Sequence, residues 1–196
     1  MKKAALHNLG CKVNAYETEA MQHLLEEAGY EIVPFTQKAD VYVINTCSVT
    51  NMADRKSRQM LHKAKKNNPD SIVVAAGCYV QTSEKEVLND LSVDIVIGND
   101  RKHDLVRLLE EYSLDSVNDT VDDINDGKHD FEELFIDQTK EHTRAFIKVQ
   151  DGCNQFCSYC IIPYARGRVR SRRFENVIAE VERLAANGFK EVVLTG

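Results

Sequence analysis

The sequence has no tryptophan, only three prolines and no apolar run that approaches the ~20 residues of a membrane-spanning helix. We therefore expect no membrane association, whereas the missing tryptophan excludes nothing by itself. We also expect no secretory signal peptide, because Lys2 and Lys3 are followed by only three apolar residues before His7. These absences predict a cytoplasmic protein, in which disulfides between its six cysteines would be unusual.

Acidic residues are concentrated in one segment. The net charge is −6, but residues 113–143 alone carry −8, while residues 144–196 carry +4. Because the acid is localised, the overall charge does not argue against a nucleic-acid partner. Asp, Asn and Ser dominate residues 113–130, so we predict that 113–143 is an acidic linker and that its first part is a solvated spacer.

Residues 1–112 alternate between strand and helix patterns. Strands are expected at 3–9, 31–34, 41–45, 72–76 and 93–97, and helices at 16–28, 51–67, 84–90 and 102–112. This alternation predicts a parallel sheet of four or five strands with helices on both faces.

A second domain is expected over residues 144–196. Its pattern is a strand at 144–150, a helix at 174–187 and another strand from 191. A βα barrel needs several more such units to close. We therefore expect that the chain is a fragment cut inside this domain.

Three cysteines lie within eight residues with CxxxCxxC spacing, namely Cys153, Cys157 and Cys160. Three thiolates on one loop can hold three irons of a four-iron cluster and leave the fourth iron open to a cofactor or substrate. Electron-carrier clusters instead use four protein thiolates.

The other three cysteines, Cys11, Cys47 and Cys78, each follow a predicted strand. Ligands collect at the carboxyl ends of parallel strands. We therefore expect these cysteines to converge on a second three-thiolate site.

A structural zinc is an alternative for either group. Zinc sites usually combine a CxxC pair with a second pair or with histidines, and His7 and His62 stay open as fourth ligands. In that case the protein would be a non-catalytic nucleic-acid-binding module. Taken singly, Cys47 or Cys78 could also be an unreactive core residue.

Two basic stretches each allow two interpretations. Five arginines occur at 166–173, and they either form salt bridges or bind phosphate or cofactor oxygens. The basic helix at 51–67 is either an ordinary solvated helix or contacts a nucleic-acid backbone.

These motifs resemble the radical S-adenosylmethionine methylthiotransferases. The matching stretches are Gly10-Cys11-Lys-Val-Asn14, Asn45-Thr46-Cys47, Gly77-Cys78, Gly152-Cys153 through Pro163, and Arg166-Gly-Arg-Val-Arg170-Ser-Arg172. The resemblance covers nearly all of the chain. It implies an α/β fold, with a parallel-sheet N-terminal methylthiotransferase domain at 1–112, the linker at 113–143 and the truncated start of a radical-SAM βα partial barrel at 144–196.

The resemblance also implies cofactors and catalytic residues. Cys153, Cys157 and Cys160 would hold a 4Fe–4S cluster whose open iron binds S-adenosylmethionine, and Tyr159 would lie near the adenine of that cofactor. Reductive cleavage of the cofactor would then give the radical that attacks an unactivated C–H bond.

The same resemblance assigns Cys11, Cys47 and Cys78 to an auxiliary 4Fe–4S cluster, whose open iron would carry the sulfur. Two clusters and S-adenosylmethionine are therefore the expected cofactors. An electron donor such as flavodoxin or ferredoxin is an expected partner.

Residues 10–21 are similar to the branch that acts on threonylcarbamoyladenosine in the anticodon loop of tRNA. That branch converts N6-threonylcarbamoyladenosine at position 37 to its 2-methylthio derivative. Isopentenyladenosine in tRNA and an aspartate of a ribosomal protein are the alternative substrates. We expect the 196-residue chain alone to be inactive on tRNA, because its barrel would be incomplete.

Overall fold

The computed structural model describes residues 1–112, 118–127, 129–136 and 144–196. In the described part of the chain, six strands form one parallel sheet, in the order β2-β1-β3-β4-β5-β6. Their bounds are β1 (Lys3–Asn8), β2 (Glu31–Ile32), β3 (Val41–Thr46), β4 (Ile72–Gly77), β5 (Ile95–Ile97) and β6 (Asn118–Thr120).

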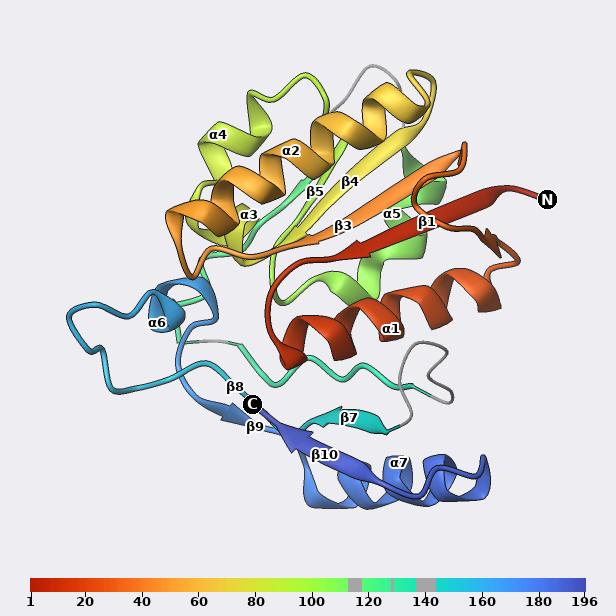
Figure 1. Cartoon of the computed structure of the whole chain (residues 1–196). Coiled ribbons are helices and arrows are strands. Elements are labelled where there is room, and N and C mark those ends of the chain that lie inside the picture. Colours follow the sequence, from red (N-terminus) through yellow and green to blue (C-terminus); the bar gives the residue numbers. More distant parts are fainter. Residues whose placement is uncertain (113–117, 128, 137–143) are drawn as a thin grey trace.

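Helices cover both faces of this sheet (Figure 1). They are α1 (Lys12–Glu27), α2 (Asn51–Asn67), α3 (Cys78–Thr82), α4 (Glu84–Leu88), the 3-10 turn η1 (Lys102–Asp104) and α5 (Leu105–Glu111). Local signals set the bounds of α2. Thr50 caps its first turn by accepting a hydrogen bond from the backbone N–H of Ala53, and Pro69 follows its end.

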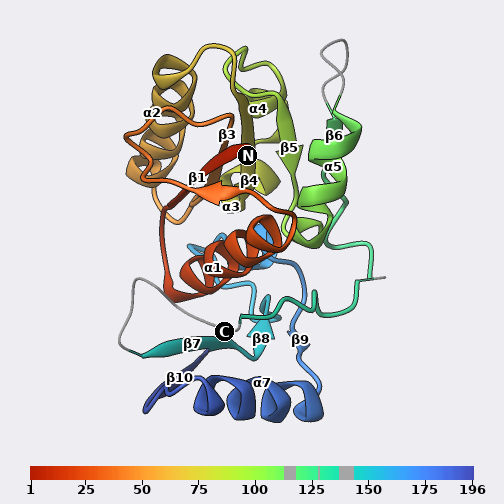
Figure 2. The ribbon, with the colours of Figure 1, turned by 90° about the vertical axis from the view of Figure 1, so that its right-hand side faces the viewer.

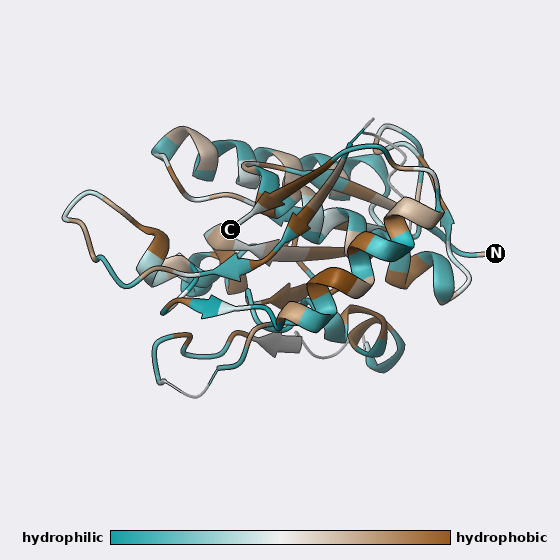
Figure 3. Ribbon diagram, turned by 90° about the horizontal axis from the view of Figure 1, so that it is seen from below, coloured by the Kyte–Doolittle hydropathy of each residue, from teal (hydrophilic) through white to brown (hydrophobic). Residues whose placement is uncertain are grey.

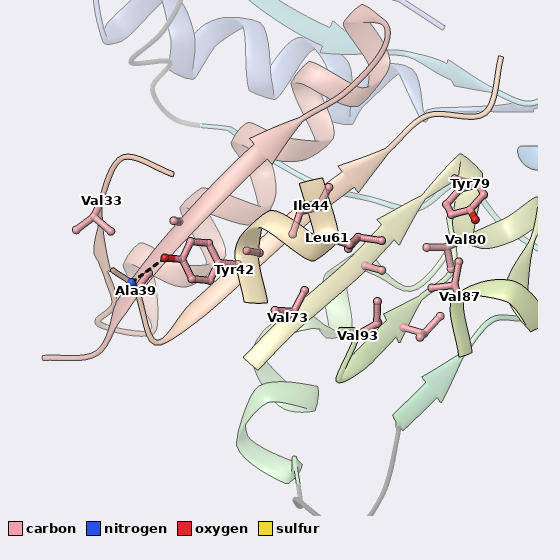
Figure 4. Close-up of a cluster of buried hydrophobic side chains, with 14 residues drawn as sticks. Val33, Ala39, Tyr42, Ile44, Leu61, Val73, Tyr79, Val80, Val87 and Val93 are labelled. Atoms are coloured by element: carbon pink, nitrogen blue, oxygen red, sulfur yellow. Dashed lines mark hydrogen bonds between the residues drawn. The ribbon is translucent and has the colours of Figure 1, made fainter. Parts of the chain in front are cut away.

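The core consists of two apolar layers, one on each face of the sheet. On one face, Ile44 and Val73 pack with Leu61 of α2 and Val80 of α3 (Figure 4). On the other face, strand residues pack against α1 and α5. In Figure 3 several strands are brown, whereas two short strands are teal and the helices carry both colours.

The second part of the chain begins another βα unit. Its elements are β7 (Ala145–Lys148), β8 (Gln150–Asp151), α6 (Ile162–Ala165), β9 (Arg170–Ser171), α7 (Phe174–Ala186) and β10 (Val192–Thr195). Strands β7 and β10 pair in parallel, and β8 pairs with β9 in antiparallel fashion. Helix α7 covers the β7–β10 pair.

Helix α1 belongs to both parts of the structure, since it lies between the large sheet and the β7–β10 pair (Figure 2). Met21 faces the large sheet, whereas Tyr16 and Ala20 pack in a third core cluster with Ile147 and Leu184. The two parts therefore share a buried helix and do not meet only through a linker.

The fold class predicted from the sequence is confirmed. The structure differs from the expected elements at α1, which begins directly after Cys11, and at the short helices α3 and α6, which were not expected. In the described part of the chain, no helix is long and apolar enough to cross a membrane.

The segment predicted as a linker differs from a solvated spacer where it is described. Within the predicted spacer, residues 118–120 form strand β6 and Ile124 is buried. In the rest of the linker, beyond residue 130, Leu134 and Ile136 are also buried. The Asp-rich composition of the segment did not indicate that these apolar side chains would be buried. Residues 113–117, 128 and 137–143 lie outside the described residues, and the domain boundaries at 112 and 143 stay a prediction.

The junction between β4 and α3 yields a stability prediction. Gly77 has φ +97°, and a Cβ there would lie 2.4 Å from Asn45 Oδ1 and 2.7 Å from the Thr46 carbonyl. Gly29 also has positive φ, at +83°, but a Cβ there would meet nothing within 4 Å. We expect Gly77→Ala to lower the free energy of unfolding by about 1–3 kcal/mol more than Gly29→Ala, measured by urea denaturation. Equal effects would mean that the close packing at Gly77 is unimportant.

Candidate metal centre

Cys11, Cys47 and Cys78 lie at one edge of the sheet. Cys11 is the N-cap of α1 after β1, Cys47 directly follows β3, and Cys78 is the first residue of α3 after β4. Strands β1, β3 and β4 are adjacent and parallel, so their carboxyl ends emerge side by side (Figure 1). Cys47 and Cys78 are buried, and Cys11 is exposed.

Buried polar side chains hold the ends of these strands together. Asn14 Nδ2 donates to the carbonyl oxygens of Leu9 at 2.7 Å and Thr46 at 2.8 Å. Thr46 Oγ1 donates to the Ala76 carbonyl at 2.6 Å. Asn45 Nδ2 donates to the Asn14 carbonyl at 3.0 Å. The spacing of the three cysteine-bearing loops is thus fixed by hydrogen bonds.

Gly10 brings the first loop against the Cys47 sulfur. A Cβ at Gly10 would lie 2.9 Å from Cys47 Sγ, and the residue has φ +115°. A hollow of about 260 Å³ opens beside these two residues, and Met52 and Lys56 of α2 contribute to its wall. Only glycine permits both this backbone conformation and this approach to the sulfur.

The three thiols are close enough to interact electrostatically. The pKa of the Cys47 thiol is raised mainly by burial, and negative charge at Cys78 and Cys11 raises it further. The backbone N–H of Val49 and the cation of Arg166 act in the opposite direction.

Three thiols are a donor set that iron–sulfur clusters use. Across the described residues, no group of three cysteine, histidine or carboxylate side chains could hold a single metal ion. A single zinc would require sulfur ligands at about 2.3 Å from one centre. In a four-iron cluster each thiolate binds a different iron, so three thiolates can be more widely spaced. The three strand-end thiols and the missing Cβ of Gly10 fit such a group.

The CxxxCxxC loop lies between β8 and α6. The backbone N–H of Cys153 donates to the Gly167 carbonyl at 3.0 Å, and that of Cys160 donates to the Cys157 carbonyl at 2.9 Å. Gly152 has φ +73°, and a Cβ there would lie 2.2 Å from the Arg168 carbonyl. These contacts hold the start of the loop against the residues that follow α6.

Aromatic side chains shape the loop. Phe156 has φ +48°, and its ring meets Tyr164 edge-on at 5.6 Å between centroids. The Arg168 guanidinium lies 4.3 Å from the Phe156 ring centroid. Tyr159 is 90% exposed. Cys157 is exposed, while its two neighbouring cysteines are partly buried. The structure does not test the ligand roles of the six cysteines or of Tyr159, which stay predictions.

A buried network of charges joins α1 to the second part of the chain. Glu17 Oε1 accepts hydrogen bonds from Lys148 Nζ at 2.7 Å and Arg166 Nη1 at 2.9 Å. Lys102 Nζ lies 3.4 Å from the other Glu17 oxygen. Asp151 pairs with the same two cations, 2.5 Å from Lys148 Nζ and 3.0 Å from Arg166 Nη1. All five side chains are buried.

The cations of this network keep its carboxylates ionised. Burial would raise the pKa of Glu17, but Arg166 and the two lysines hold it well below its usual value. Burial also opposes the charge of Asp151, yet Lys148 and Arg166 lower the pKa of Asp151 to about 2. The network is therefore a set of full charges at neutral pH.

The run of five arginines divides between two environments. Arg166 and Arg172 are buried and Arg170 is partly buried, and each forms an ion pair with a carboxylate. Arg168 and Arg173 are exposed. The salt-bridge interpretation thus holds for three of the five.

Several site residues were not identified from the sequence alone. Asn14 and Thr46 stand out in the sequence only as parts of motifs, Arg166 only as one of five clustered arginines, and Glu17 and Asn99 do not stand out. The signal for Asn14 and Thr46 was their place within three residues of a strand-end cysteine. The pairing of Glu17 with Arg166 had no local signal, because the two residues are 149 positions apart.

Comparison with known families gives two matches. Residues 3–98 match a family described as "Uncharacterized protein family UPF0004", and residues 147–196 match the "Radical SAM superfamily". The two segments correspond to the large sheet and to the unit that carries the CxxxCxxC loop. They define a radical S-adenosylmethionine protein with an additional α/β domain, and this superfamily implies S-adenosylmethionine and a 4Fe–4S cluster as cofactors.

Three individual relatives indicate which family within this superfamily the chain belongs to. The chain is 47% identical over its whole length to "Threonylcarbamoyladenosine tRNA methylthiotransferase MtaB" of Bacillus subtilis, and covers 44% of that protein. It is 45% identical over 99% of its length to the protein of the same name from Aquifex aeolicus, and covers 47% of it. It is 35% identical over 97% of its length to a "tRNA-2-methylthio-N(6)-dimethylallyladenosine synthase" of Thermoanaerobacter, and covers 41% of it. The chain belongs to the radical S-adenosylmethionine methylthiotransferase family, and it spans a little under half the length of these relatives.

The charge network yields a prediction about stability and pH. Glu17→Gln removes the negative charge that three buried cations share. We therefore expect it to lower the free energy of unfolding at pH 7 by about 3–5 kcal/mol. Because the pKa of Glu17 is lower in the folded than in the unfolded protein, its stabilisation is present above the unfolded pKa of about 4.3 and is lost as the pH falls through the folded value. The gap between wild type and variant should therefore narrow in acid.

Urea denaturation between pH 7 and pH 3 measures this gap. Glu31→Gln is the matched control, because Glu31 is exposed, and it should change stability little at any pH. A Glu17→Gln protein as stable as the control at pH 7 would contradict the account.

Proposed function

We propose that the complete protein methylthiolates N6-threonylcarbamoyladenosine at position 37 of tRNA, giving the 2-methylthio derivative. The observation that carries this proposal is the arrangement of two three-cysteine groups, one at the ends of β1, β3 and β4 and one in the CxxxCxxC loop. The similarity of the whole chain to tRNA methylthiotransferases at 47% and 45% identity supports the tRNA substrate.

In this proposal each cysteine group binds one 4Fe–4S cluster and leaves one iron open. Cys153, Cys157 and Cys160 would hold the cluster that binds S-adenosylmethionine. Cys11, Cys47 and Cys78 would hold the auxiliary cluster. The bound clusters and S-adenosylmethionine would supply radical C–H activation and sulfur transfer, which no side chain can supply by acid–base chemistry.

The chain's own residues would keep the two groups in place. Gly152 and the hydrogen bond from Cys153 to Gly167 close the CxxxCxxC loop at its base. Asn14 and Thr46 tie together the strand ends that carry the other group. Because α1 packs in the core of both parts, the two groups keep a defined relation to each other. The anticodon loop of tRNA and an electron donor such as flavodoxin or ferredoxin are the partners of the proposed reaction.

A second candidate substrate is isopentenyladenosine in tRNA. Relatives at 35% identity carry the name of the dimethylallyladenosine enzyme, and the chain resembles them over 97% of its length. The higher identity to the threonylcarbamoyladenosine enzymes favours the first candidate.

The substrate is tested with the complete protein, reconstituted without oxygen, and two tRNA preparations that carry either modification. We expect the methylthio product, detected by mass spectrometry of the digested nucleosides, only from the threonylcarbamoyladenosine tRNA. Turnover of the isopentenyladenosine tRNA alone would transfer the assignment to the second candidate, and turnover of neither would contradict a tRNA substrate.

Separate roles for the two cysteine groups predict different losses. In the complete protein, Cys47→Ala should leave reductive cleavage of S-adenosylmethionine intact but abolish methylthiolated tRNA. Cys153→Ala is the matched comparison and should abolish both. Release of 5′-deoxyadenosine and formation of the modified nucleoside are the two readouts. Loss of cleavage in Cys47→Ala would mean that the groups are not separate sites.

A further inference from the structure

The Cys78 sulfur contacts a residue that also reaches the second part of the chain. Asn99 lies in the loop after β5 and is fully buried. Its side-chain Nδ2 is 3.8 Å from Cys78 Sγ and 2.5 Å from the carbonyl oxygen of Ala165 in α6. Its Oδ1 accepts a hydrogen bond from Lys102 Nζ at 2.8 Å. One amide therefore connects the sulfur, α6 and the charge network.

The next residue after Ala165 is Arg166, whose guanidinium is held on several sides. Nη1 donates to Glu17 and Asp151, and Nη2 donates to Asn14 Oδ1 at 2.7 Å. Burial opposes its charge, but negative charge at Cys78, followed by Glu17 and Asp151, holds the pKa of Arg166 well above its usual value. Asn14 Oδ1 also lies 3.7 Å from Cys11 Sγ. Arg166 is therefore one side chain away from Cys11, and its neighbour Ala165 is one side chain away from Cys78.

We propose that Asn99 and Arg166 are positioning residues for the Cys78 sulfur, supplying an N–H donor and a positive charge to the metal–sulfur centre at the strand ends. Arg166 comes from the second part of the chain, so that centre depends on how the two parts are packed together. This inference rests on the proposed function, which assigns Cys78 to the auxiliary cluster.

The expected consequence is a change in redox behaviour. A reduced cluster carries one more negative charge than an oxidised one, and hydrogen bonds and charge near its sulfurs set its potential. Asn99 and Arg166 would favour the reduced state. Removing either residue should therefore shift the midpoint potential of the auxiliary cluster to more negative values.

The test uses the complete protein in which Cys153, Cys157 and Cys160 are replaced by Ala, so that only the auxiliary cluster can bind. Midpoint potentials are measured by dye-mediated titration followed by electron paramagnetic resonance. We expect negative shifts for Arg166→Met and Asn99→Ala. Arg166→Lys should give a smaller shift, because it keeps the positive charge but loses the two-nitrogen hydrogen-bonding geometry of the guanidinium. Arg173→Met is the matched control, because Arg173 is exposed in the same part of the chain, and it should not shift the potential.

Iron content and thermal unfolding of each variant show whether it is folded and loaded. If Arg166→Met fails to fold, Arg166→Lys and Asn99→Ala decide the question. Potentials equal to that of the Arg173→Met control in the folded variants would overturn the proposal. A parent protein that binds no cluster through Cys11, Cys47 and Cys78 would overturn it together with the proposed function. Unchanged potentials in the folded variants, combined with a wild-type protein that methylthiolates tRNA, would overturn only the positioning role.

Discussion

The arrangement of the molecule depends on one buried carboxylate, that of Glu17. It lies on α1, and its oxygens are within ion-pair distance of Lys102, Lys148 and Arg166, of which the last two belong to the second part of the chain. Desolvated ions of this kind are tolerated only when their partners are held in good geometry. The apolar contacts of Tyr16 and Ala20 beside it bury the same surface of α1. Charge pairing thus specifies how the two parts meet, and apolar burial supplies the stabilisation.

This packing gives the two cysteine groups, which are distant in the sequence, a fixed arrangement in space. The strand-end cysteines are fixed by the register of β1, β3 and β4, and Asn14 ties two of those strand ends together while also accepting from Arg166. The CxxxCxxC loop is closed at its base by Gly152 and Gly167 and leads through α6 to the same arginine. Arg166 is therefore connected to both cysteine groups by short paths of bonded or packed residues.

The sequence predicted those parts of the fold that local signals determine. The bounds of α2 agree because Thr50 and Asn68-Pro69 are local start and stop signals. Helix α3 was not predicted because five residues show no helical period, and β6 was not predicted because Asn118–Thr120 is a polar triplet. The convergence of Cys11, Cys47 and Cys78 on one edge could be inferred from the parallel topology. The Glu17–Arg166 pairing could not, because it depends on tertiary packing alone.

Iron and sulfide analysis of the complete protein, purified without oxygen, shows whether its six thiolates form two separate iron–sulfur centres. We expect about eight irons and eight sulfides per chain, since each 4Fe–4S cluster contributes four of each. Replacing either cysteine group with alanine should leave about four. A wild-type content of about four irons that is unaffected by alanine at positions 11, 47 and 78 would mean that the strand-end cysteines bind no cluster.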